Sequence, residues 1–199
     1  MTPVTKASAD SSDPRWTGRQ VLVAVTGGIA CFKAASLVSR LVQGGAMVRV
    51  VMTDAAIRFV TPLTFEALSG QSVGTNVWQS TVGNDAAHIE LARWPDLVIV
   101  APATADCIAR IAAGRCDDLV TLCLCALKRS TPVVVAPAMN EQMWQNPVTQ
   151  RNLKTLQDLL GYHQVGPDEG WHACRSQGPG RMTEPDRILE AAVTLSVAR

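Results

Sequence analysis

The sequence lacks an excess of charge of either sign. Its 199 residues carry 18 Lys and Arg and 17 Asp and Glu, which gives a net charge of about +1. Because nucleic acids and anionic membrane surfaces are bound through concentrated basic patches, this balance argues against both partners. The composition, 47% hydrophobic and 18% charged, instead indicates an ordinary globular protein that is long enough to bury one core.

The first eighteen residues, MTPVTKASADSSDPRWTG, lack a long apolar run. They offer neither the apolar core of a signal peptide nor a membrane span. We therefore expect a disordered tail over residues 1–18, a single domain over residues 19–199 and a cytoplasmic protein. In a reducing compartment the six cysteines are expected as free thiols. The Cys123-x-Cys125 pair predicts no metal site, because helical residues i and i+2 face different ways.

Short apolar runs rich in β-branched residues alternate with helical patterns along the whole chain. Strands are expected at residues 20–28, 46–53, 71–78, 95–103, 131–138 and 162–166. Helices are expected at residues 29–45, 55–69 with an interruption at Pro62, 104–114, 117–127, 147–161 and 184–198. The strands are continuous apolar runs, as in parallel sheets covered on both faces. We predict a single three-layer α/β domain with a doubly wound parallel sheet, Rossmann-like or flavodoxin-like.

The sequence also lacks both common phosphate-binding loops. TGGIACFK, at residues 26–33, follows the first expected strand but matches neither G-x-G-x-x-G nor the Gly-Lys-Ser/Thr loop. Its glycines still bring backbone N–H groups to a helix N-terminus, where an anion is favoured. Thr53 ends the second expected strand and Thr104 starts the helix after the fourth. Their hydroxyls either reach a phosphate or ribityl group or simply cap helices. Asp54 would suit a ribose, but the glycine spacing does not fit a dinucleotide site.

Three further stretches carry candidate functional side chains. His88 stands at a helical turn before a strand, where it is either a packed residue or a base. Asn140 and Met143 lie in APAMNEQMW, which is either a packed turn or the apolar floor of a pocket with one amide. Cys174 lies in GWHACRSQGPGRMTEP, where the Gly and Pro residues indicate a loop rather than a core.

HIELARWPDLVIVAPATAD, PAMNEQMW and GPGRMTEP together resemble the homo-oligomeric flavin-containing cysteine decarboxylases. The resemblance extends from about residue 21 to residue 185, and it implies FMN as cofactor. It also implies a homotrimer or a multiple of one, such as a homododecamer, with the flavin near a subunit boundary. Trp94 and Trp144, which we expect near the site loops, would add apolar surface for association. The implied FMN-binding residues are Gly27, Gly28, Ile29, Thr53, Phe59, Thr104, Ala105, Asp106, Cys107, Ala138 and Met139.

The reaction implied by this resemblance is decarboxylation of the small molecule 4'-phosphopantothenoylcysteine to 4'-phosphopantetheine, in coenzyme A biosynthesis. The flavin oxidises the substrate thiol to a thioaldehyde-like species, CO₂ leaves, and the resulting enethiol is protonated and reduced. By resemblance, His88 serves the oxidation and decarboxylation, and Asn140 and Met143 bind the substrate. Cys174 then donates the late proton from a flap that closes over the site.

The flap departs from the family pattern. Most members carry Gly-Asp directly after this cysteine, whereas this chain carries Arg175-Ser176. An adjacent Arg lowers a thiol pKa and replaces a residue suited to a positive φ angle, which makes His172 an alternative donor. Because the flap differs, a peptidyl-cysteine decarboxylase is a competing interpretation. A non-catalytic flavin-fold subunit that inhibits a phosphatase is another, although the long acidic extensions of such subunits are missing.

Overall fold

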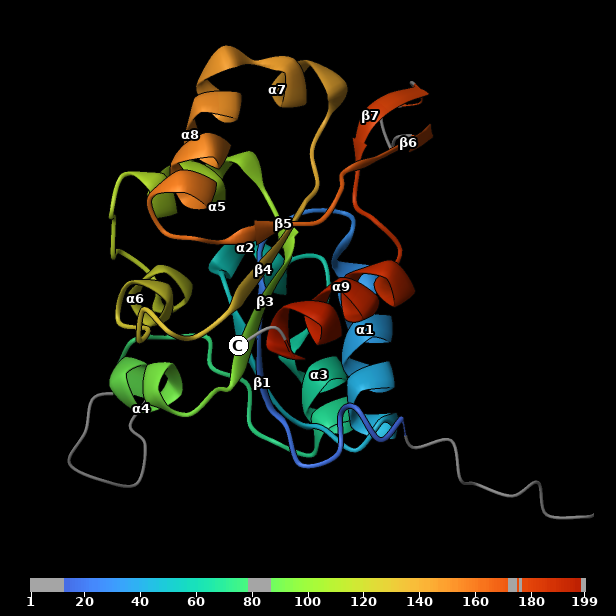
Figure 1. Ribbon diagram of the computed structural model, residues 1–199, viewed down its shortest axis with the longest axis vertical. Coiled ribbons are helices and arrows are strands. Elements are labelled where there is room, and N and C mark those ends of the chain that lie inside the picture. Colours follow the sequence, from blue (N-terminus) through green and yellow to red (C-terminus); the bar gives the residue numbers. More distant parts are fainter. Residues whose placement is uncertain (1–12, 79–86, 172–174, 176, 198–199) are drawn as a thin grey trace, which may run out of the picture.

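Five parallel strands form the central sheet, in the order β2-β1-β3-β4-β5 (Figure 1). A computed structural model describes residues 13–78, 87–171, 175 and 177–197. All seven residues of β3 are buried, as the continuous apolar runs predict for a sheet covered on both faces. The predicted doubly wound parallel sheet is therefore confirmed. The strands are Gln20–Val25 (β1), Met47–Met52 (β2), Leu97–Ala103 (β3), Val133–Pro137 (β4) and His163–Gln164 (β5).

Helices cover both faces of the sheet and complete three layers (Figure 1). One face carries α1 (Cys31–Gln43), α3 (Pro62–Ser69) and α9 (Pro185–Val197). The other carries α4 (Ala87–Arg93), α5 (Ala105–Ala112), α6 (Leu119–Cys125) and α8 (Pro147–Asp158). Successive side chains of a strand point to opposite faces, so Leu22 packs in one apolar cluster and Val23 in the other. Two short helices, α2 (Asp54–Ile57) and α7 (Glu141–Gln145), follow β2 and β4.

Two segments differ from the sequence-based expectation. Residues 71–78 form no strand and contribute only an isolated bridge from Gly74 to Val51. A Cβ atom on Gly74 would lie 2.8 Å from Leu119, so this segment is pressed against α6 instead of pairing along its length. The Gly- and Pro-rich stretch near the C-terminus, expected as a loop, includes an antiparallel hairpin of β6 (Asp168–Trp171) and β7 (Gln177–Arg181).

Residues 13–18, which were expected to be part of an N-terminal tail, are packed against the domain. Trp16 is only 3% exposed and belongs to the apolar cluster under α1. The backbone N–H of Gly18 donates to the carbonyl oxygen of Gly45 at 3.0 Å. Residues 13–18 therefore belong to the domain, which corrects the predicted boundary, while residues 1–12 lie outside the described part of the chain.

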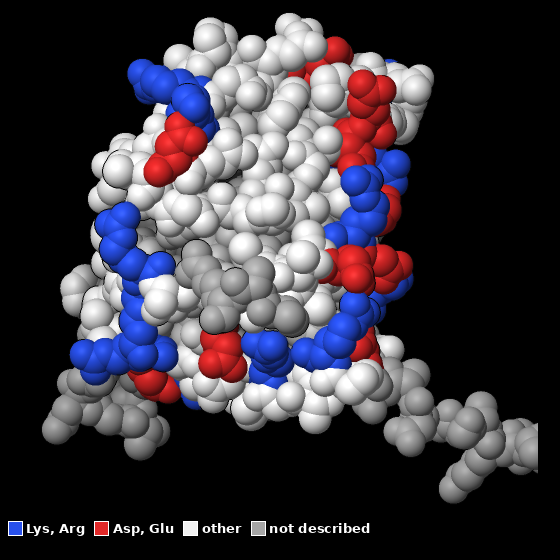
Figure 2. Space-filling view, viewed as in Figure 1, with Lys and Arg blue, Asp and Glu red and all other residues white. Residues whose placement is uncertain are grey.

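Charged side chains of both signs alternate along the edge formed by α1, α9 and the hairpin (Figure 2). Several form ion pairs there, including Arg15 with Glu190, Arg40 with Asp186 and Arg187 with Asp168. Neither sign prevails along this edge of the face shown in Figure 2. Within the described ranges, no helix has the length and apolarity needed to cross a membrane.

Candidate active site

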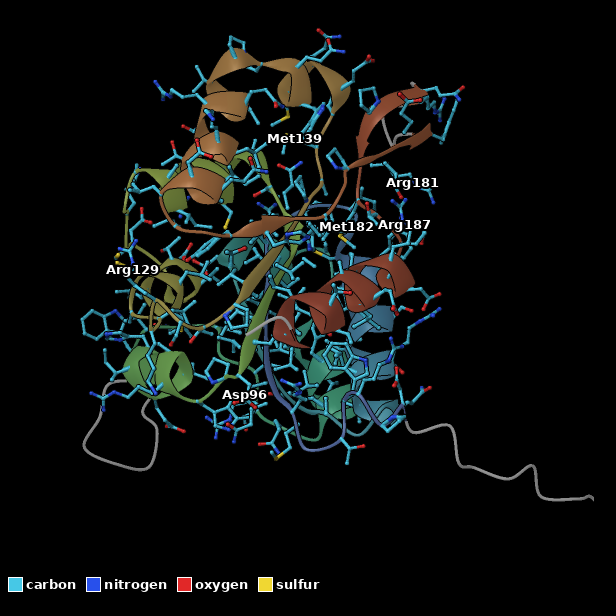
Figure 3. The ribbon with its side chains drawn as sticks, in the orientation of Figure 1. Asp96, Arg129, Met139, Arg181, Met182 and Arg187 are labelled. Atoms are coloured by element: carbon cyan, nitrogen blue, oxygen red, sulfur yellow. The ribbon has the colours of Figure 1, made fainter. Side chains whose placement is uncertain are left out.

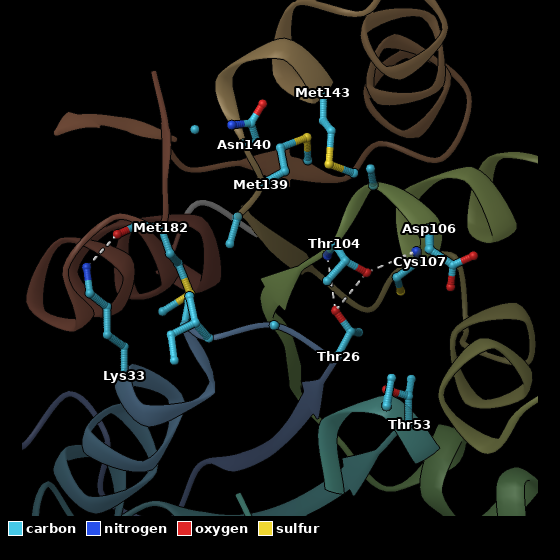
Figure 4. A pocket seen from close by; sticks show the side chains of 18 of the residues that line it. Thr26, Lys33, Thr53, Thr104, Asp106, Cys107, Met139, Asn140, Met143 and Met182 are labelled. Atoms are coloured by element: carbon cyan, nitrogen blue, oxygen red, sulfur yellow. Dashed lines mark hydrogen bonds between the residues drawn. The ribbon is translucent and has the colours of Figure 1, made fainter. Parts of the chain in front are cut away.

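A cavity of about 910 Å³ lies at the carboxyl ends of β1 to β4 (Figure 4). It opens where the strand order reverses between β1 and β3, the usual ligand position in doubly wound sheets. The turn after β1, the starts of α2 and α5 and the segment after β4 all line it. Among the predicted site residues, those at the cavity are Gly27, Gly28, Ile29, Thr53, Thr104, Ala105, Asp106, Cys107, Ala138, Met139, Asn140 and Met143.

Three threonine hydroxyls stand at the lower wall of this cavity (Figure 4). Thr53 Oγ1 caps α2 by accepting from the N–H of Ala56 at 3.2 Å, and Thr104 Oγ1 caps α5 by accepting from Cys107 at 3.3 Å. The capping interpretation of these residues is therefore correct. Capping uses acceptor lone pairs, however, so the hydroxyl proton can still donate to a ligand. Capping and ligand binding are compatible roles here.

Thr26, at the end of β1, was missed by the sequence analysis. Its hydroxyl is buried, donates to the carbonyl oxygen of Pro102 at 2.6 Å and accepts from the N–H of Thr104 at 3.0 Å. These bonds fix the turns after β1 and β3 relative to each other across the switch point. The available signal was one polar residue directly after an otherwise apolar strand.

The two glycines of the turn after β1 have different functions. A Cβ on Gly27 would lie 2.3 Å from the Cβ of Ala55, so only glycine lets this turn approach α2. A Cβ on Gly28 would lie 3.7 Å from Thr104, which is ordinary contact distance. The following helix α1 has no side-chain cap at Ala30. The N–H groups of Cys31 and Lys33 donate to the carbonyl oxygens of Gly28 and Ala30, which leaves the N–H of Phe32 oriented for an anion.

The opposite wall is formed by Met139, Asn140 and Met143 (Figure 4). Asn140 is the N-cap of α7, with its Oδ1 accepting from the N–H of Gln142 at 2.8 Å. A capping side chain is held in a defined position, and the amide of Asn140 lines the cavity beside two thioethers. Both interpretations of this stretch, packed turn and pocket wall, thus describe the same residues.

The hairpin of β6 and β7 closes one side of the cavity through Trp171, Gly180 and Arg181, and Met182 follows directly after β7. It leads to the loop of Cys174 and the alternative donor His172, and both of these residues lie outside the described part of the chain. Arg175 is described and adopts a φ of +64°, a conformation that favours glycine. The sequence-based concern that this position suits a positive φ is therefore correct.

Lys33 supports the segment after this hairpin from below. Its side chain is buried, and its ammonium group donates to the carbonyl oxygen of Met182 at 2.8 Å and to Glu184 at 2.9 Å. Lys33 and Arg181 were both missed in the sequence analysis. The pattern of α1 alone predicts a buried apolar face and gives no reason for a lysine within it, since its partners lie about 150 residues later.

Cys107 lines the cavity but is unsuited to nucleophilic chemistry. Burial, with smaller contributions from the carboxylates of Asp118 and Asp106, raises the pKa of its thiol to about 12. Burial also raises the pKa of Cys31, beneath the glycine turn. Both thiols are neutral at physiological pH and pack as small apolar groups. Across the described residues, no three His, Cys, Asp or Glu side chains gather as a metal site.

Two predicted site residues are not at the cavity of their own chain. His88 lies in the first turn of α4, a helix that packs against α6 and leads into the amino end of β3. Its Nδ1 atom is buried and has no hydrogen-bond partner among the described residues. Phe59 follows α2 and is 52% exposed, outside the cavity lining.

The two tryptophans expected to provide exposed apolar surface near the site do not do so. Trp94 lies at the amino end of β3, with the guanidinium of Arg49 4.7 Å from its ring centroid. Trp144 is half-buried and packs against the apolar cluster under α5 and α8. The exposed apolar side chains at the cavity are instead Ile29, Phe32, Met143 and Trp171.

Comparison with known families decides how this cavity is classified. The family model described as Flavoprotein matches residues 10–196, nearly the whole chain. The protein belongs to the flavoprotein family. Membership agrees with the cavity position, because flavoprotein cofactors in doubly wound folds bind beyond the carboxyl ends of the strands.

Two curated relatives are identical to the chain at about half of the aligned positions. The coenzyme A biosynthesis bifunctional protein CoaBC of Vibrio cholerae is 51% identical over 172 residues, which are 86% of this chain and 42% of that protein. The CoaBC protein of Escherichia coli K12 is 48% identical over 177 residues, which are 88% of this chain and 43% of that protein. The chain thus spans less than half the length of these curated relatives.

Two solved flavoprotein structures have the same fold. A cysteine-to-serine mutant of PPC decarboxylase, complexed with pantothenoylaminoethenethiol, superimposes with a TM-score of 0.80 at 34% identity, covering 92% of this chain and 100% of that one. The FMN binding protein AtHal3 superimposes with a TM-score of 0.78 at 33% identity, covering 91% of this chain and 98% of that one.

Proposed function

We propose that the protein is an FMN-dependent decarboxylase that converts 4'-phosphopantothenoylcysteine to 4'-phosphopantetheine. The observation that carries this proposal is one cavity with two chemically different walls. The lower wall offers hydroxyls and an uncapped helix N-terminus, and the upper wall offers Asn140 between two methionines. The likeness to CoaBC proteins and to a PPC decarboxylase supports the same reaction.

The residues of the lower wall fit FMN. The cavity volume of about 910 Å³ suits a ligand of that size. The N–H of Phe32 at the start of α1 and the hydroxyls of Thr53 and Thr104 suit one phosphate and a ribityl chain. Gly28 leaves the backbone accessible at this point. The likeness to the FMN binding protein AtHal3 supports FMN rather than a dinucleotide.

The upper wall suits the substrate's cysteinyl group. FMN, when bound, supplies the two-electron oxidation of the substrate thiol and returns the electrons after CO₂ has left. Asn140 is neutral and can donate from its amide to the substrate carboxylate without the strong attraction of a cation. Met139 and Met143 exclude water from this end, and a less polar surrounding favours loss of a carboxylate charge.

Two further residues, Cys174 and His88, complete the proposed mechanism, although neither is among the described residues that line the cavity. Cys174, carried by the loop of the hairpin, donates the late proton as a neutral thiol. His88 reaches a cavity from a second copy of the chain, in a trimer or a multiple of one. The buried Nδ1 of His88, unpartnered within the described ranges, supports this assignment. So do the exposed side chains of Ile29, Phe32 and Phe59, which suit a contact between copies.

Mixing two inactive variants tests this shared site. His88→Asn and Asn140→Asp are each expected to keep FMN and to lose CO₂ release. If the two residues serve one site from different copies, subunits mixed after dissociation regain part of the activity, because some sites then carry both native residues. Mixed oligomers that stay inactive, although subunit exchange is demonstrated by mass, would contradict the shared site.

A substrate panel tests the reaction itself. CO₂ release is measured with 4'-phosphopantothenoylcysteine, with pantothenoylcysteine and with short peptides that end in cysteine. We expect turnover of the small substrates and none of the peptides. Turnover of peptides alone would favour a peptidyl-cysteine decarboxylase, and FMN binding without any turnover would favour a non-catalytic subunit.

A further inference from the structure

The charged side chains that line the cavity are divided between two walls. The wall formed by α2, α5 and the loop before α6 is acidic, and its carboxylates belong to Asp54, Asp106, Asp117 and Asp118. Arg110 is the cation on this wall, and it lies 3.0 to 3.3 Å from three of these side chains. Arg115 also pairs with Asp117, so four carboxylates face two guanidinium groups. This wall therefore keeps a net negative charge and disfavours the phosphate of a substrate.

The wall formed by the hairpin carries the opposite balance. The Oε1 atom of Glu184 accepts from Lys33 at 2.9 Å and also pairs with the guanidinium of Arg181. One carboxylate therefore faces two cations. Both cations line the cavity, but the Lys33 side chain is buried and its ammonium is held by the carbonyl oxygen of Met182, whereas the side chain of Arg181 is 43% exposed. The surplus positive charge is thus available at Arg181.

The neighbouring ion pair does not cancel this surplus. Arg187 and Asp168 pair with each other at 2.9 Å, and Asp168 also accepts from the hydroxyl of Thr183. Figure 3 shows Arg181 where β7 leaves the hairpin, on the same side of the molecule as Arg187. Arg187 is not part of the cavity lining, so Arg181 is the hairpin cation that a ligand in the cavity can reach.

A glycine fixes the position of Arg181. A Cβ on Gly170, in the facing strand β6, would lie 2.9 Å from Cδ and 3.2 Å from Nη1 of Arg181. The arginine side chain therefore lies directly against the bare backbone of Gly170, next to Trp171. A side chain packed along a strand pair loses less freedom when it binds an anion, which favours a specific contact.

We propose that Arg181 binds the phosphate monoester at the far end of the substrate and so selects phosphorylated substrates. This inference rests on the proposed decarboxylase function. The substrate carries two anionic groups, a carboxylate that must leave and a phosphate that stays. A cation at the carboxylate would stabilise the ground state and slow its loss, whereas Asn140 contacts it without charge. An arginine suits the phosphate, which it can bind through two parallel hydrogen bonds.

The test compares 4'-phosphopantothenoylcysteine with its dephosphorylated form on the FMN-loaded protein. For Arg181→Gln we expect kcat/KM for the phosphorylated substrate to fall by about tenfold or more, through KM, with little change for the dephosphorylated one. Arg181→Lys should regain part of the loss. Gly170→Ala displaces Arg181 without removing its charge. It should likewise lower kcat/KM for the phosphorylated substrate and leave kcat/KM for the dephosphorylated one little changed. Arg187→Gln, in the neighbouring ion pair, is the matched control and should change kcat/KM for neither substrate.

Four outcomes would overturn this inference. An equal loss on both substrates assigns Arg181 a structural or carboxylate-binding role, and no loss on either removes it from the site. Weakened FMN binding with unchanged substrate preference would show that Arg181 binds the phosphate of the cofactor and not that of the substrate. Wild-type protein that uses both substrates equally well keeps the decarboxylase proposal but removes phosphate selection. Failure of the decarboxylase proposal is distinct, because wild-type protein would then release no CO₂ from either.

Discussion

The backbone N–H of Met139 donates to the carbonyl oxygen of Gly180 at 2.9 Å. This bond joins the segment after β4 directly to β7, although the two residues are far apart in the chain. It sets the wall that contains Asn140 next to the hairpin that leads to Cys174. This bond therefore joins the segment of the amide that we propose for substrate binding to the strand β7 of the hairpin.

Replacement of Asn140 by aspartate separates its two roles. An aspartate oxygen can still accept from the N–H of Gln142 and cap α7, but its charge repels the substrate carboxylate. We expect FMN binding and thermal stability to be kept, and KM to rise so far that CO₂ release is lost at the substrate concentrations that the wild type uses. Asn146→Asp is the control, because Asn146 caps α8 through the same contact at 2.8 Å and does not line the cavity. Unchanged KM in Asn140→Asp would remove Asn140 from the substrate site.

The two glycines after β1 should respond differently to alanine. In Gly27→Ala the new Cβ would lie 2.7 Å from the carbonyl carbon of Ala55, so the turn must move. We expect a loss of about 1–3 kcal/mol in the free energy of unfolding and weaker FMN binding. Gly28→Ala has room and should change the stability by less than about 1 kcal/mol. Urea unfolding of both variants checks this, and equal stabilities would show that the turn is not constrained by α2.

The flap residue Arg175 should be replaceable with a gain in stability. A non-glycine residue at a φ of +64° costs about 1–2 kcal/mol. Arg175→Gly removes this cost and should be more stable than Arg175→Ala, which removes the same charge but keeps a Cβ. CO₂ release by Arg175→Gly should equal or exceed that of the wild type. If the two variants unfold at the same temperature, the positive φ does not matter in solution.

The buried thiols predict how stability depends on alkaline pH. Burial is the main cause that raises the pKa of Cys107 and of Cys123 to about 12, from a usual value of 9.0. Above pH 9 the unfolded chain ionises these thiols and the folded chain does not, so stability is complete below pH 9 and is lost between pH 9 and 12. The loss is about 1.4 kcal/mol per pH unit for each thiol.

Alanine variants isolate this effect from other alkaline transitions. The double variant Cys107→Ala/Cys123→Ala should start less stable, because two buried side chains are shortened. Its free energy of unfolding should nevertheless fall less steeply with pH than that of the wild type. Equal slopes in urea titrations between pH 8 and pH 10.5, a range chosen around the usual thiol pKa of about 8.5–9, would contradict the assignment.

Most of the fold was predictable because its strands are continuous apolar runs. β1, β3 and β4 have this pattern and were located within a few residues. The hairpin was not predictable, since β7 reads QGPGR and local propensity there favours a loop. Its strands are held by tertiary contacts, such as the bond from Met139 to Gly180. Tertiary contact overrides local preference at this point.

The site was predictable where it follows strand ends and not where it depends on distant packing. Turn glycines and capping threonines are local features, and the sequence places them at the correct edge of the sheet. The roles of Thr26 and Lys33 depend on carbonyl groups 76 and 149 residues away, so no local pattern reveals them. The sequence around His88 likewise does not indicate which cavity this residue serves, because His88 lies away from the cavity of its own chain.

A single anaerobic turnover tests the central proposal most directly. FMN-loaded protein is mixed with one equivalent of 4'-phosphopantothenoylcysteine, and the product mass, the CO₂ and the flavin absorbance are followed together. For wild-type protein we expect one CO₂, a product lighter by that mass and flavin that returns to its oxidised spectrum. For Cys174→Ser we expect CO₂ release, lasting loss of flavin colour and an oxidised product. Substrate recovered unchanged, with no CO₂ and no change in the flavin spectrum, would contradict the proposed reaction.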